Sequence, residues 1–244
     1  MFRIMRPVML AALTSALGAG CRAGESAAPA ALTRNDVPVF PTDANSFVAQ
    51  IDNPYLAFAP GRVFHYQSVT ADGLETSVVE VTNRNKRILG IAATVVHDQV
   101  YLDGALVEDT FDWYAQDQQG NVWYLGEDSK QIENGVVVGT EGSWEAGVNG
   151  ATAGIIMLAQ PKVGTQYRQE FAAGVAEDMA KVLDLSTTVQ VNFGSFTGCL
   201  KTEEWTPLEP GVRESKYYKP GVGLVLELQP KGGGVRNELT AIEN

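Results

Sequence analysis

From Val37 onward the chain consists of short β-type runs separated by glycine-containing turns, and this alternation is what most constrains its fold. The runs are rich in β-branched and aromatic residues, which suit a pleated, half-buried surface. Asp-Gly pairs begin at Asp72 and Asp103 and an Asn-Gly pair begins at Asn134, and such pairs favour hairpins. The expected strands are 63–69, 75–82, 91–102, 105–116, 121–127, 187–193, 196–205, 216–218 and 223–228. Tight turns join antiparallel neighbours, so the pattern predicts an all-β meander with few or no helices.

One segment, Gly174–Asp184, fits two kinds of structure. Glu177 and Lys181 are four residues apart, a spacing that supports a helix. Small or apolar residues also alternate with polar ones from Ala176 to Val182, as a strand requires. We favour a strand, while a helix here would plug one face of the sheet.

The first twenty residues have the layout of a secretory signal. Arg3 and Arg6 precede an apolar run, and small residues lead up to Cys21. This arrangement resembles the lipobox of bacterial lipoproteins, although Gly18 stands where that motif usually has leucine. The resemblance implies cleavage before Cys21, acylation of its sulfur with palmitate or a similar chain, and attachment to the membrane. A plain secretory signal is the alternative.

Composition changes after the signal and again near residue 37. We expect residues 1–20 to be the signal peptide, residues 21–36 a flexible tether rich in Ala, Gly and Ser, and residues 37–244 a single β-rich domain. Arg22 directly follows the cysteine. By the lipoprotein sorting pattern, which associates Asp at this place with the inner membrane, Arg22 favours an outer-membrane anchor that faces the periplasm.

The chain is acidic, and this limits its partners. Removing Arg3 and Arg6 from the formal charge of −11 leaves −13 for the mature chain. Such a surface repels nucleic acid, so we expect no nucleic-acid partner. An acidic surface suits cationic ligands, or simply solubility. Cys199 is the remaining cysteine once Cys21 is acylated, which excludes an intrachain disulfide.

Asp109 is the most unusual residue in the predicted strand 105–116. Strict alternation places it on the same face as Phe111 and Trp113, which is the more apolar face of that strand. A carboxylate on a buried face must be paired, hydrogen-bonded or protonated. We therefore expect Asp109 to point to a core or pocket, where Arg168 is the candidate partner.

Three of the four tryptophans fall in the middle of the chain, close to several acidic residues. Aromatic rings and carboxylates together can line a pocket for a cation, a sugar or an apolar molecule. The same aromatic pairs can simply stabilise a sheet. With Asp109 and Arg168, the candidate ligand-binding residues are Trp113, Trp123, Glu127, Trp144, Glu145 and Glu170.

Recognised catalytic and metal motifs are absent from the sequence. His65 and His97 lack the spacing of metal ligands, so we expect no metal and no cofactor. A calcium site could still be gathered near Asp117 from nearby acidic and amide residues. No G-x-S-x-G elbow is present. A glycosidase-type carboxylate pair could be drawn from Glu145, Glu170 and Glu177.

Two segments resemble bacterial secreted domains. Residues 216–225 read KYYKPGVGLV and resemble a YYxPGVGLV ending, and residues 191–202 are similar to the strand-turn-strand before it. The middle segments EDTFDWYAQD, NVWYLGED and GSWEAG are also similar. The resemblance is to uncharacterised lipoproteins built like the LolA-type open β-half-barrel. It implies a curved, open sheet whose concave face holds a lipid or another apolar ligand, and it assigns no catalytic residue.

These observations favour one function and leave two alternatives. The favoured function is a cell-envelope lipoprotein that binds a small apolar or lipid-like ligand in a concave β-sheet pocket, without catalysis. The first alternative is a structural or assembly lipoprotein that docks an envelope protein. The second is an envelope hydrolase that uses a carboxylate pair.

Overall fold

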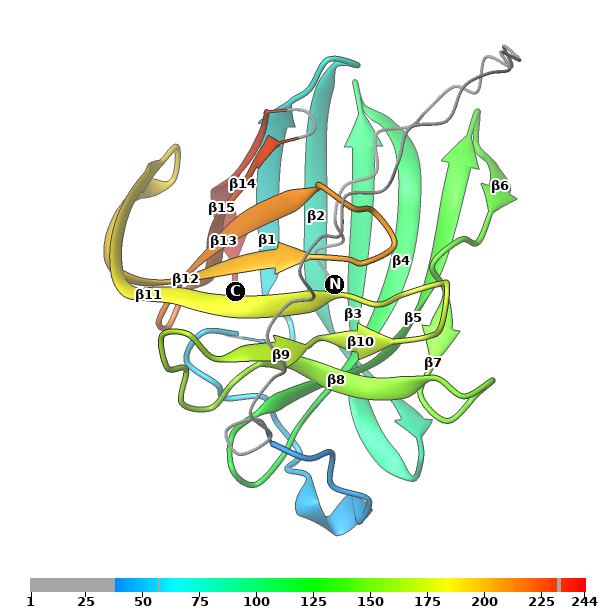
Figure 1. Ribbon diagram of the computed structural model, residues 1–244. Helices are drawn as coiled ribbons and strands as arrows, with labels where there is room; N and C mark the ends of the chain where they lie inside the picture. The colour runs from blue at the N-terminus through cyan, green and yellow to red at the C-terminus, as the bar shows by residue number, and fades with distance from the viewer. Residues whose placement is uncertain (1–37, 57, 232–233) are drawn as a thin grey trace, which may run out of the picture.

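The computed structural model describes residues 38–56, 58–231 and 234–244, so the expected signal, the tether and Cys21 lie outside the described residues. Within them the fold is almost entirely β, with a single 3-10 turn, η1, at Ala44–Ser46 (Figure 1). The strands are β1 Val63–Val69, β2 Leu74–Ile88, β3 Ile91–Leu102, β4 Ala105–Gln116, β5 Val122–Glu133, β6 Val136–Gly139, β7 Trp144–Glu145, β8 Thr152–Met157, β9 Gln166–Arg168, β10 Glu170–Phe171, β11 Met179–Val191, β12 Gly194–Trp205, β13 Arg213–Lys219, β14 Gly223–Lys231 and β15 Val235–Glu243. None of the described helices is long or apolar enough to cross a membrane.

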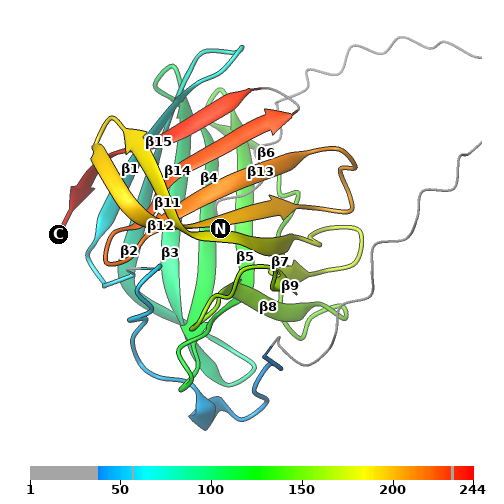
Figure 2. The same cartoon turned by 60° about the vertical axis from the view of Figure 1, so that its left-hand side comes forward.

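All fifteen strands belong to one antiparallel sheet, in the order β10-β8-β5-β4-β3-β2-β1-β15-β14-β13-β12-β11-β9, while β6 and β7 both pair with β5. The sheet curls so that β11 and β12 face the other strands across its interior (Figure 2). The prediction of an all-β, antiparallel meander that forms an open, curved sheet is confirmed.

Several predicted strands have the observed bounds. β1, β3 and β4 begin and end where the sequence pattern places them. The others are longer than predicted, and β2 continues to Ile88 because its polar final third still pairs with β3. The pattern missed β15 and the strands from β6 to β10, which have only two to six residues each. In the ambiguous segment, β11 begins at Met179, so the strand interpretation is confirmed from that residue onward.

Two of the three predicted turns have the dihedral angles expected of two-residue hairpins. Asp103 and Asn134 have φ near 50°, and each is followed by a glycine with positive φ. Leu89 adopts the same left-handed conformation at φ 51°, which is rare for leucine. Around Asp72 the connection has four residues instead of two, and the Thr70 amide donates to the carbonyl of Gly73.

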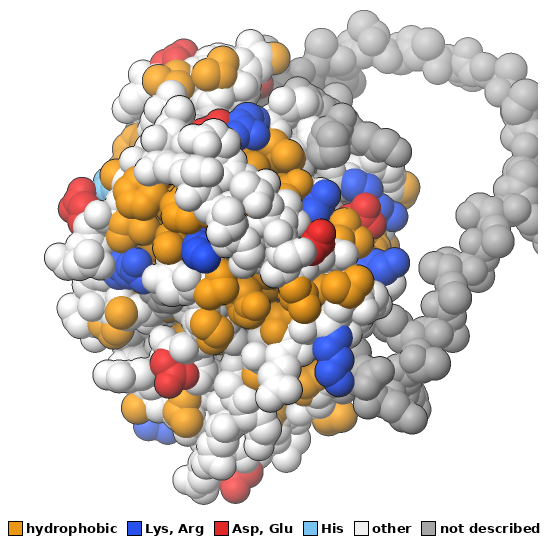
Figure 3. Space-filling view, turned by 90° about the vertical axis from the view of Figure 1, so that its left-hand side faces the viewer, with side chains coloured by type: hydrophobic (Ala, Val, Ile, Leu, Met, Phe, Trp, Pro, Cys, Tyr) orange, Lys and Arg blue, Asp and Glu red, His pale blue; other side chains and the backbone are white. Residues whose placement is uncertain are grey.

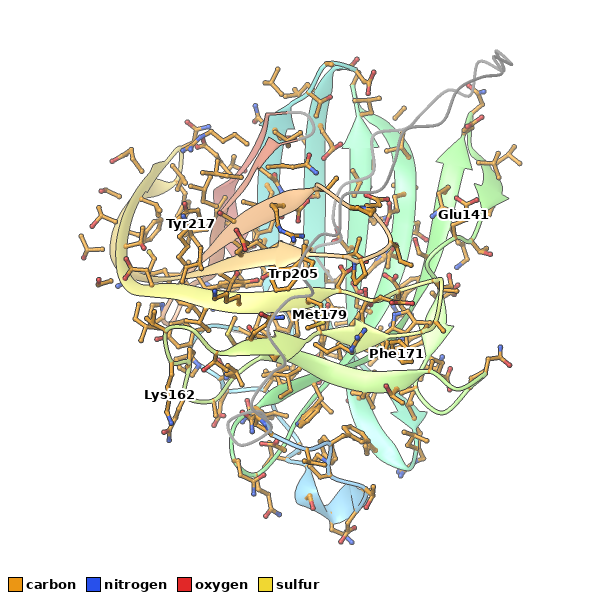
Figure 4. All side chains as sticks on the ribbon, viewed as in Figure 1. Glu141, Lys162, Phe171, Met179, Trp205 and Tyr217 are labelled. Atoms are coloured by element: carbon orange, nitrogen blue, oxygen red, sulfur yellow. The ribbon has the colours of Figure 1, made fainter. Side chains whose placement is uncertain are left out.

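The two ends of the strand order meet at Gln169. β9 pairs with β11 and β10 pairs with β8, and only this residue separates β9 from β10. Its backbone amide donates to the carbonyl of Asp178. Gly154 in β8 permits this approach, because a Cβ there would overlap the carbonyl of Gln169. Phe171 and Met179 lie on either side of the junction (Figure 4).

The outer face of the sheet carries aromatic rings that are shielded by cationic side chains. Arg213 lies over the ring of Trp205 at 4.8 Å, and Lys201 lies 5.3 Å from the centre of Tyr217. Figure 3 shows hydrophobic side chains gathered on one outer face with lysine and arginine side chains beside them. Apolar residues of this sheet are therefore not confined to its interior.

Candidate functional site

The register of β3, β4 and β5 determines which side chains share the inner face. Asp98 pairs with Thr110 and Asp112 pairs with Glu127, so these four lie on one face. Tyr114 pairs with Tyr124 on the same face. The opposite face carries the residues in between. None of the inward positions of these three strands, all of them within the described residues, is Lys or Arg.

Four carboxylates on this face form the group that we call the inner acidic cluster: Asp98, Asp112, Glu127 and Glu170. Directly paired cross-strand residues have Cβ atoms about 5 Å apart, and diagonal neighbours are roughly 7 to 8 Å apart. Asp112 and Glu127 are a direct pair, while Asp98 lies diagonally from Asp112. Like charges in such positions repel, so the cluster is unfavourable unless it is protonated or compensated.

Aromatic side chains border the inner acidic cluster. Tyr124 stacks on Tyr114 with ring centroids 5.0 Å apart and meets the edge of Trp144 at 5.3 Å. Its hydroxyl donates to Asp112 Oδ1 at 2.7 Å. The indole N–H of Trp144 donates to Glu170 Oε2 at 2.9 Å, which ties β7 to β10. The cluster is thus held in place by aromatic donors.

Gly126 is the residue that lets Trp144 approach. It has φ of 135°, and a Cβ there would overlap the backbone carbonyl of Trp144. Strand β7 therefore lies closely against β5, with Trp144 directly paired to Glu127.

Asp98 and Gln169 are among the buried polar side chains on this side of the sheet that have atoms without a hydrogen-bond partner in the described part of the chain. Asp98 is 9% exposed and its Oδ1 has none. Gln169 is 1% exposed and neither its amide oxygen nor its amide nitrogen has one. An unsatisfied buried polar group costs about 1–3 kcal/mol. Such groups occur where a ligand or another compensating group is expected.

Burial changes the ionisation of the inner acidic cluster. It raises the pKa of the Asp98 carboxyl well above its usual range, and the nearby acids Asp112, Glu108 and Glu127 raise it further. Burial also raises the pKa of Glu170, with additional contributions from Asp178 and Glu127, while the Trp144 hydrogen bond opposes the shift. These carboxyls favour their neutral form unless a positive charge is close.

A second group of inward acids lies on β12, β13 and β14 and contains its own cation. We call Glu204, Glu214, Lys216 and Glu227 the lysine cluster. Lys216 Nζ is 2.9 Å from Glu204 Oε2 and 3.9 Å from Glu214 Oε2. Burial lowers the pKa of Lys216, but the three carboxylates raise it by more, so the ammonium stays charged.

The prediction that Asp109 faces inward with Arg168 as its partner is wrong. Asp109 lies on the outer face of β4, half-buried, and its Oδ1 is 2.6 Å from His97 Nε2 on β3. Arg168 lies on β9, exposed, with its guanidinium 4.7 Å from the centre of the Phe171 ring. Alternation identified two faces of β4 correctly but not which of them lies inside.

Trp113 and Glu145 also lie on the outer face. Lys86 connects them, with its Nζ 3.3 Å from the centre of the Trp113 ring and 2.7 Å from Glu145 Oε2. The lysine covers the indole, so Trp113 is only 5% exposed although it points away from the interior. The expected meeting of these two residues with Trp144 in one pocket is therefore not observed.

Trp123 is buried at the outer base of the sheet. Its indole N–H donates to Asp117 Oδ2 at 2.8 Å, and its ring meets Phe40 edge-on at 5.1 Å. Of the eight candidate ligand-binding residues, the structure brings together Glu127, Trp144 and Glu170. It places the other five on the outer face or at the outer base.

The suggested carboxylate pair is not assembled. Glu145 lies on the outer face and Glu170 on the inner face, while Glu177 is half-buried and its carboxylate accepts from the Gly174 amide. No group of three or more His, Cys, Asp or Glu side chains within the described residues is placed to hold a metal ion. Asp117, the centre of the possible calcium site, instead accepts from the amides of a turn and from Trp123.

An open groove of about 460 Å³ lies where the β4–β5 turn meets the segment after η1. Its polar groups are largely used within the protein. Gln116 accepts from the amides of Asp52 and Asn53 and donates to the Asp52 carboxylate. The groove is therefore a weaker candidate site than the inner acidic cluster.

Sequence reasoning missed Asp98, Asp112, Gln169 and Lys216. The detectable signal was the alternation in β4, where Glu108, Thr110 and Asp112 lie on the face opposite Phe111 and Trp113. It was misread because apolar residues were assumed to point inward. Nothing local marks Gln169, whose burial depends on the meeting of β9 and β10.

Comparison with known proteins finds no matching family model and no matching curated protein. Among solved structures, the chain is similar to a "putative exported protein with YmcC-like fold" from Bacteroides fragilis, at 15% identity over 78% of this chain and 99% of the other, with a TM-score of 0.46. It is also similar to a "putative lipoprotein" from Parabacteroides distasonis, at 12% identity over 80% and 100%, with a TM-score of 0.42. Neither description names a LolA-type domain, so that resemblance stays a prediction. Both similarities are too low to assign a function to this chain.

Proposed function

We propose that this protein is a cell-envelope lipoprotein that binds a small-molecule ligand on the inner face of its curved sheet and has no catalytic role. The observation that carries the proposal is the pair of buried, incompletely satisfied polar side chains, Asp98 and Gln169, beside the inner acidic cluster. A protein that used this face only for its own stability would gain from apolar or paired residues there. A ligand offers the missing partners when it binds.

The proposed location of the protein in the cell envelope is inferred from its sequence. The signal-like segment ends at Cys21 in a lipobox-like setting, which supports export and an acyl anchor. One acyl chain binds a membrane only weakly, whereas two or more anchor stably. Arg22 favours the outer membrane by the sorting pattern.

We propose a different type of ligand from the apolar or lipid-like one expected from the sequence. An apolar or lipid-like molecule would need a continuous apolar wall, but the inner face of β3–β5 alternates carboxylates with tyrosines and Trp144. We therefore propose a ligand with polar groups that can satisfy Asp98 and Gln169.

Ligand binding is tested by native mass spectrometry of the full-length protein, produced with its own signal and released from the envelope in a mild non-ionic detergent. We expect a small-molecule adduct that disappears on denaturation. Repeated preparations that carry no adduct, and acquire none after incubation with an envelope extract, would contradict ligand binding.

The anchor is tested separately by labelling cells with radioactive palmitate. The wild-type protein should carry the label and remain in the outer-membrane fraction, while Cys21→Ala should lose both. A labelled Cys21→Ala protein, or an unlabelled wild type, would remove the anchor from the proposal without affecting the binding site. Docking of an envelope protein stays a prediction, as does the hydrolase.

A further inference from the structure

The inner acidic cluster has the chemistry of a receptor for positive charge, and this deepens the proposed function by naming the class of ligand. Its four carboxylates lie on β3, β4, β5 and β10, and every inward position of β3, β4 and β5 lacks Lys and Arg. The lysine cluster shows how this same sheet neutralises inward acids where it does so internally. No inward lysine or arginine on β3, β4 or β5 has this role for the inner acidic cluster.

A second observation, independent of the acids, points to a ligand here. Gln169 is buried with both amide atoms unpartnered. Arg168 and Phe171 share the outer face, since the guanidinium lies over the ring, so the two residues between them turn inward. Glu170, the second of these, reaches Trp144 in the inner acidic cluster. We infer that the Gln169 amide is directed to the same region.

The number and spread of the acidic groups favour an extended ligand. The four carboxylates come from four strands, with directly paired Cβ atoms about 5 Å apart and diagonal ones about 7 to 8 Å apart, so a ligand with more than one ammonium group can reach more of them than a single ammonium group can. The rings of Tyr124 and Trp144 stand beside them, and aromatic faces attract organic cations. Metal-ligand spacing is not found among the described residues.

We propose that the inner acidic cluster binds a linear organic cation that carries at least two ammonium groups, with Asp98 as a direct ligand and Gln169 contacting the chain between the charges. The proposal rests on the proposed function. The cation supplies the partner that Asp98 Oδ1 lacks, and the aromatic rings contact its methylene groups.

The test is isothermal titration calorimetry of the full-length protein in mild detergent, with spermidine as the probe and 1,8-octanediol as a neutral chain of similar length. We expect spermidine to bind at one site per chain and the diol not to bind. Asp98→Asn should weaken spermidine binding about tenfold or more, as expected for loss of a charge-assisted contact. Glu170→Gln, which keeps the acceptor for Trp144, provides a second variant should Asp98→Asn alter the fold.

Matched controls separate this site from general attraction to an acidic protein. Asp109→Asn makes the same chemical change on the outer face of β4, and Glu227→Gln removes an inward acid from the lysine cluster. Both should leave spermidine affinity within about twofold, because neither contacts the proposed site. Equal weakening by Asp98→Asn and Asp109→Asn would show surface attraction only and would overturn the proposal.

The outcomes also separate the ligand class from the proposed function. If the protein carries a native adduct but does not bind spermidine, and spermidine does not displace the adduct, the proposed ligand-binding function would stand and the organic-cation class would be overturned. No adduct and no spermidine binding would contradict both. Displacement of the adduct by spermidine, with loss of displacement in Asp98→Asn, supports both.

Discussion

The inner acidic cluster and the lysine cluster occupy the same inner face of one sheet, yet the charge of their buried carboxylates is compensated differently. In the lysine cluster, three carboxylates surround Lys216, and ion pairing compensates for the loss of water. In the inner acidic cluster, Asp98 is buried with an unpartnered oxygen and its pKa is raised by burial. In the first arrangement the counter-charge comes from within the chain, although neither carboxylate oxygen of Glu214 has a hydrogen-bond partner among the described residues. In the second, Asp98 Oδ1 is left for a proton or a bound cation to satisfy, and this is the basis of the binding site that we propose.

The largest expected effect comes from removing the internal cation. Lys216→Met would leave the buried Glu204, Glu214 and Glu227 without their counter-charge. Breaking a buried ion pair in this way costs about 3–5 kcal/mol, so we expect that loss in the free energy of unfolding at neutral pH. Urea unfolding measures it, with Lys181→Met on the outer side of β11 as the control. A loss below about 1 kcal/mol would show that the lysine cluster is not held together by Lys216.

The second-largest effect on stability is expected at the junction of β9 and β10, where Gly154 lies against Gln169. Gly154→Ala places a methyl group against the carbonyl of Gln169 and should push β8 away from the β9–β10 segment. We expect a loss of about 2 kcal/mol in unfolding free energy and weaker spermidine binding, because Gln169 and Glu170 would shift together. Gly194→Ala, where φ is not positive and the nearest atom to the added Cβ is 4.0 Å away, controls for the addition of a methyl group in open space. Unchanged stability in Gly154→Ala would mean that the contact is not close in solution.

For Asp98, whose Oδ1 has no partner among the described residues, we expect a substitution to increase the free energy of unfolding and not to decrease it. Asp98→Asn removes a buried ionisable group, so without added ligand the variant should be more stable than the wild type at pH 7.5, by about 1 kcal/mol. Lys216→Met should instead lower the stability, so the two variants together test whether the two clusters differ as described. Thermal unfolding in ligand-free buffer measures it beside Asp109→Asn. An Asp98→Asn protein that is clearly less stable than the wild type would show that Asp98 is already well satisfied.

The smallest effect is a pH dependence with an unusual direction. Burial raises the pKa of Glu227 to about 7, although Lys216 opposes the shift, and burial together with Glu227 raises the pKa of Glu75 to about 7. Between their ordinary value of 4.5 and about 7, the folded protein binds more protons than the unfolded chain. Stability therefore falls as the pH rises through that window.

We expect the ligand-free Tm to rise by roughly 2 °C as the pH falls from about 7.5 to 5. In Glu227→Gln the slope should be flatter, since one of the two groups no longer titrates. A Tm that instead decreases steadily over this range would contradict the raised pKa values. Circular dichroism melts at constant ionic strength provide the measurement.

Much of the fold could be predicted, because it depends on local patterns. β1, β3 and β4 have the expected bounds, and Asp103 and Asn134 form the expected turns. The meeting of β9 and β10 at Gln169 could not be predicted, since it depends on the curl of the whole sheet and on one close contact at Gly154.

The site was predicted less well, for a physical reason. The inward side of a strand was inferred from its apolar row, but Trp113 points outward beneath Lys86, and Trp123 points outward beneath Phe40. A sheet whose outer apolar residues are covered can carry acids on its inner face. Glu127 and Trp144 were found because aromatic and acidic residues cluster in that stretch, and Glu170 because it was considered for a carboxylate pair, independently of which face was assigned.

The most direct test of the central claim is the number of protons released when spermidine binds. Calorimetric titrations at about pH 6 in buffers of different ionisation enthalpy measure that number. Because spermidine is already fully charged, binding beside carboxyls of raised pKa should expel about one proton per cation from the wild type and markedly fewer from Asp98→Asn. Spermidine binding without proton release, or equal release from both proteins, would contradict a cation site built on Asp98.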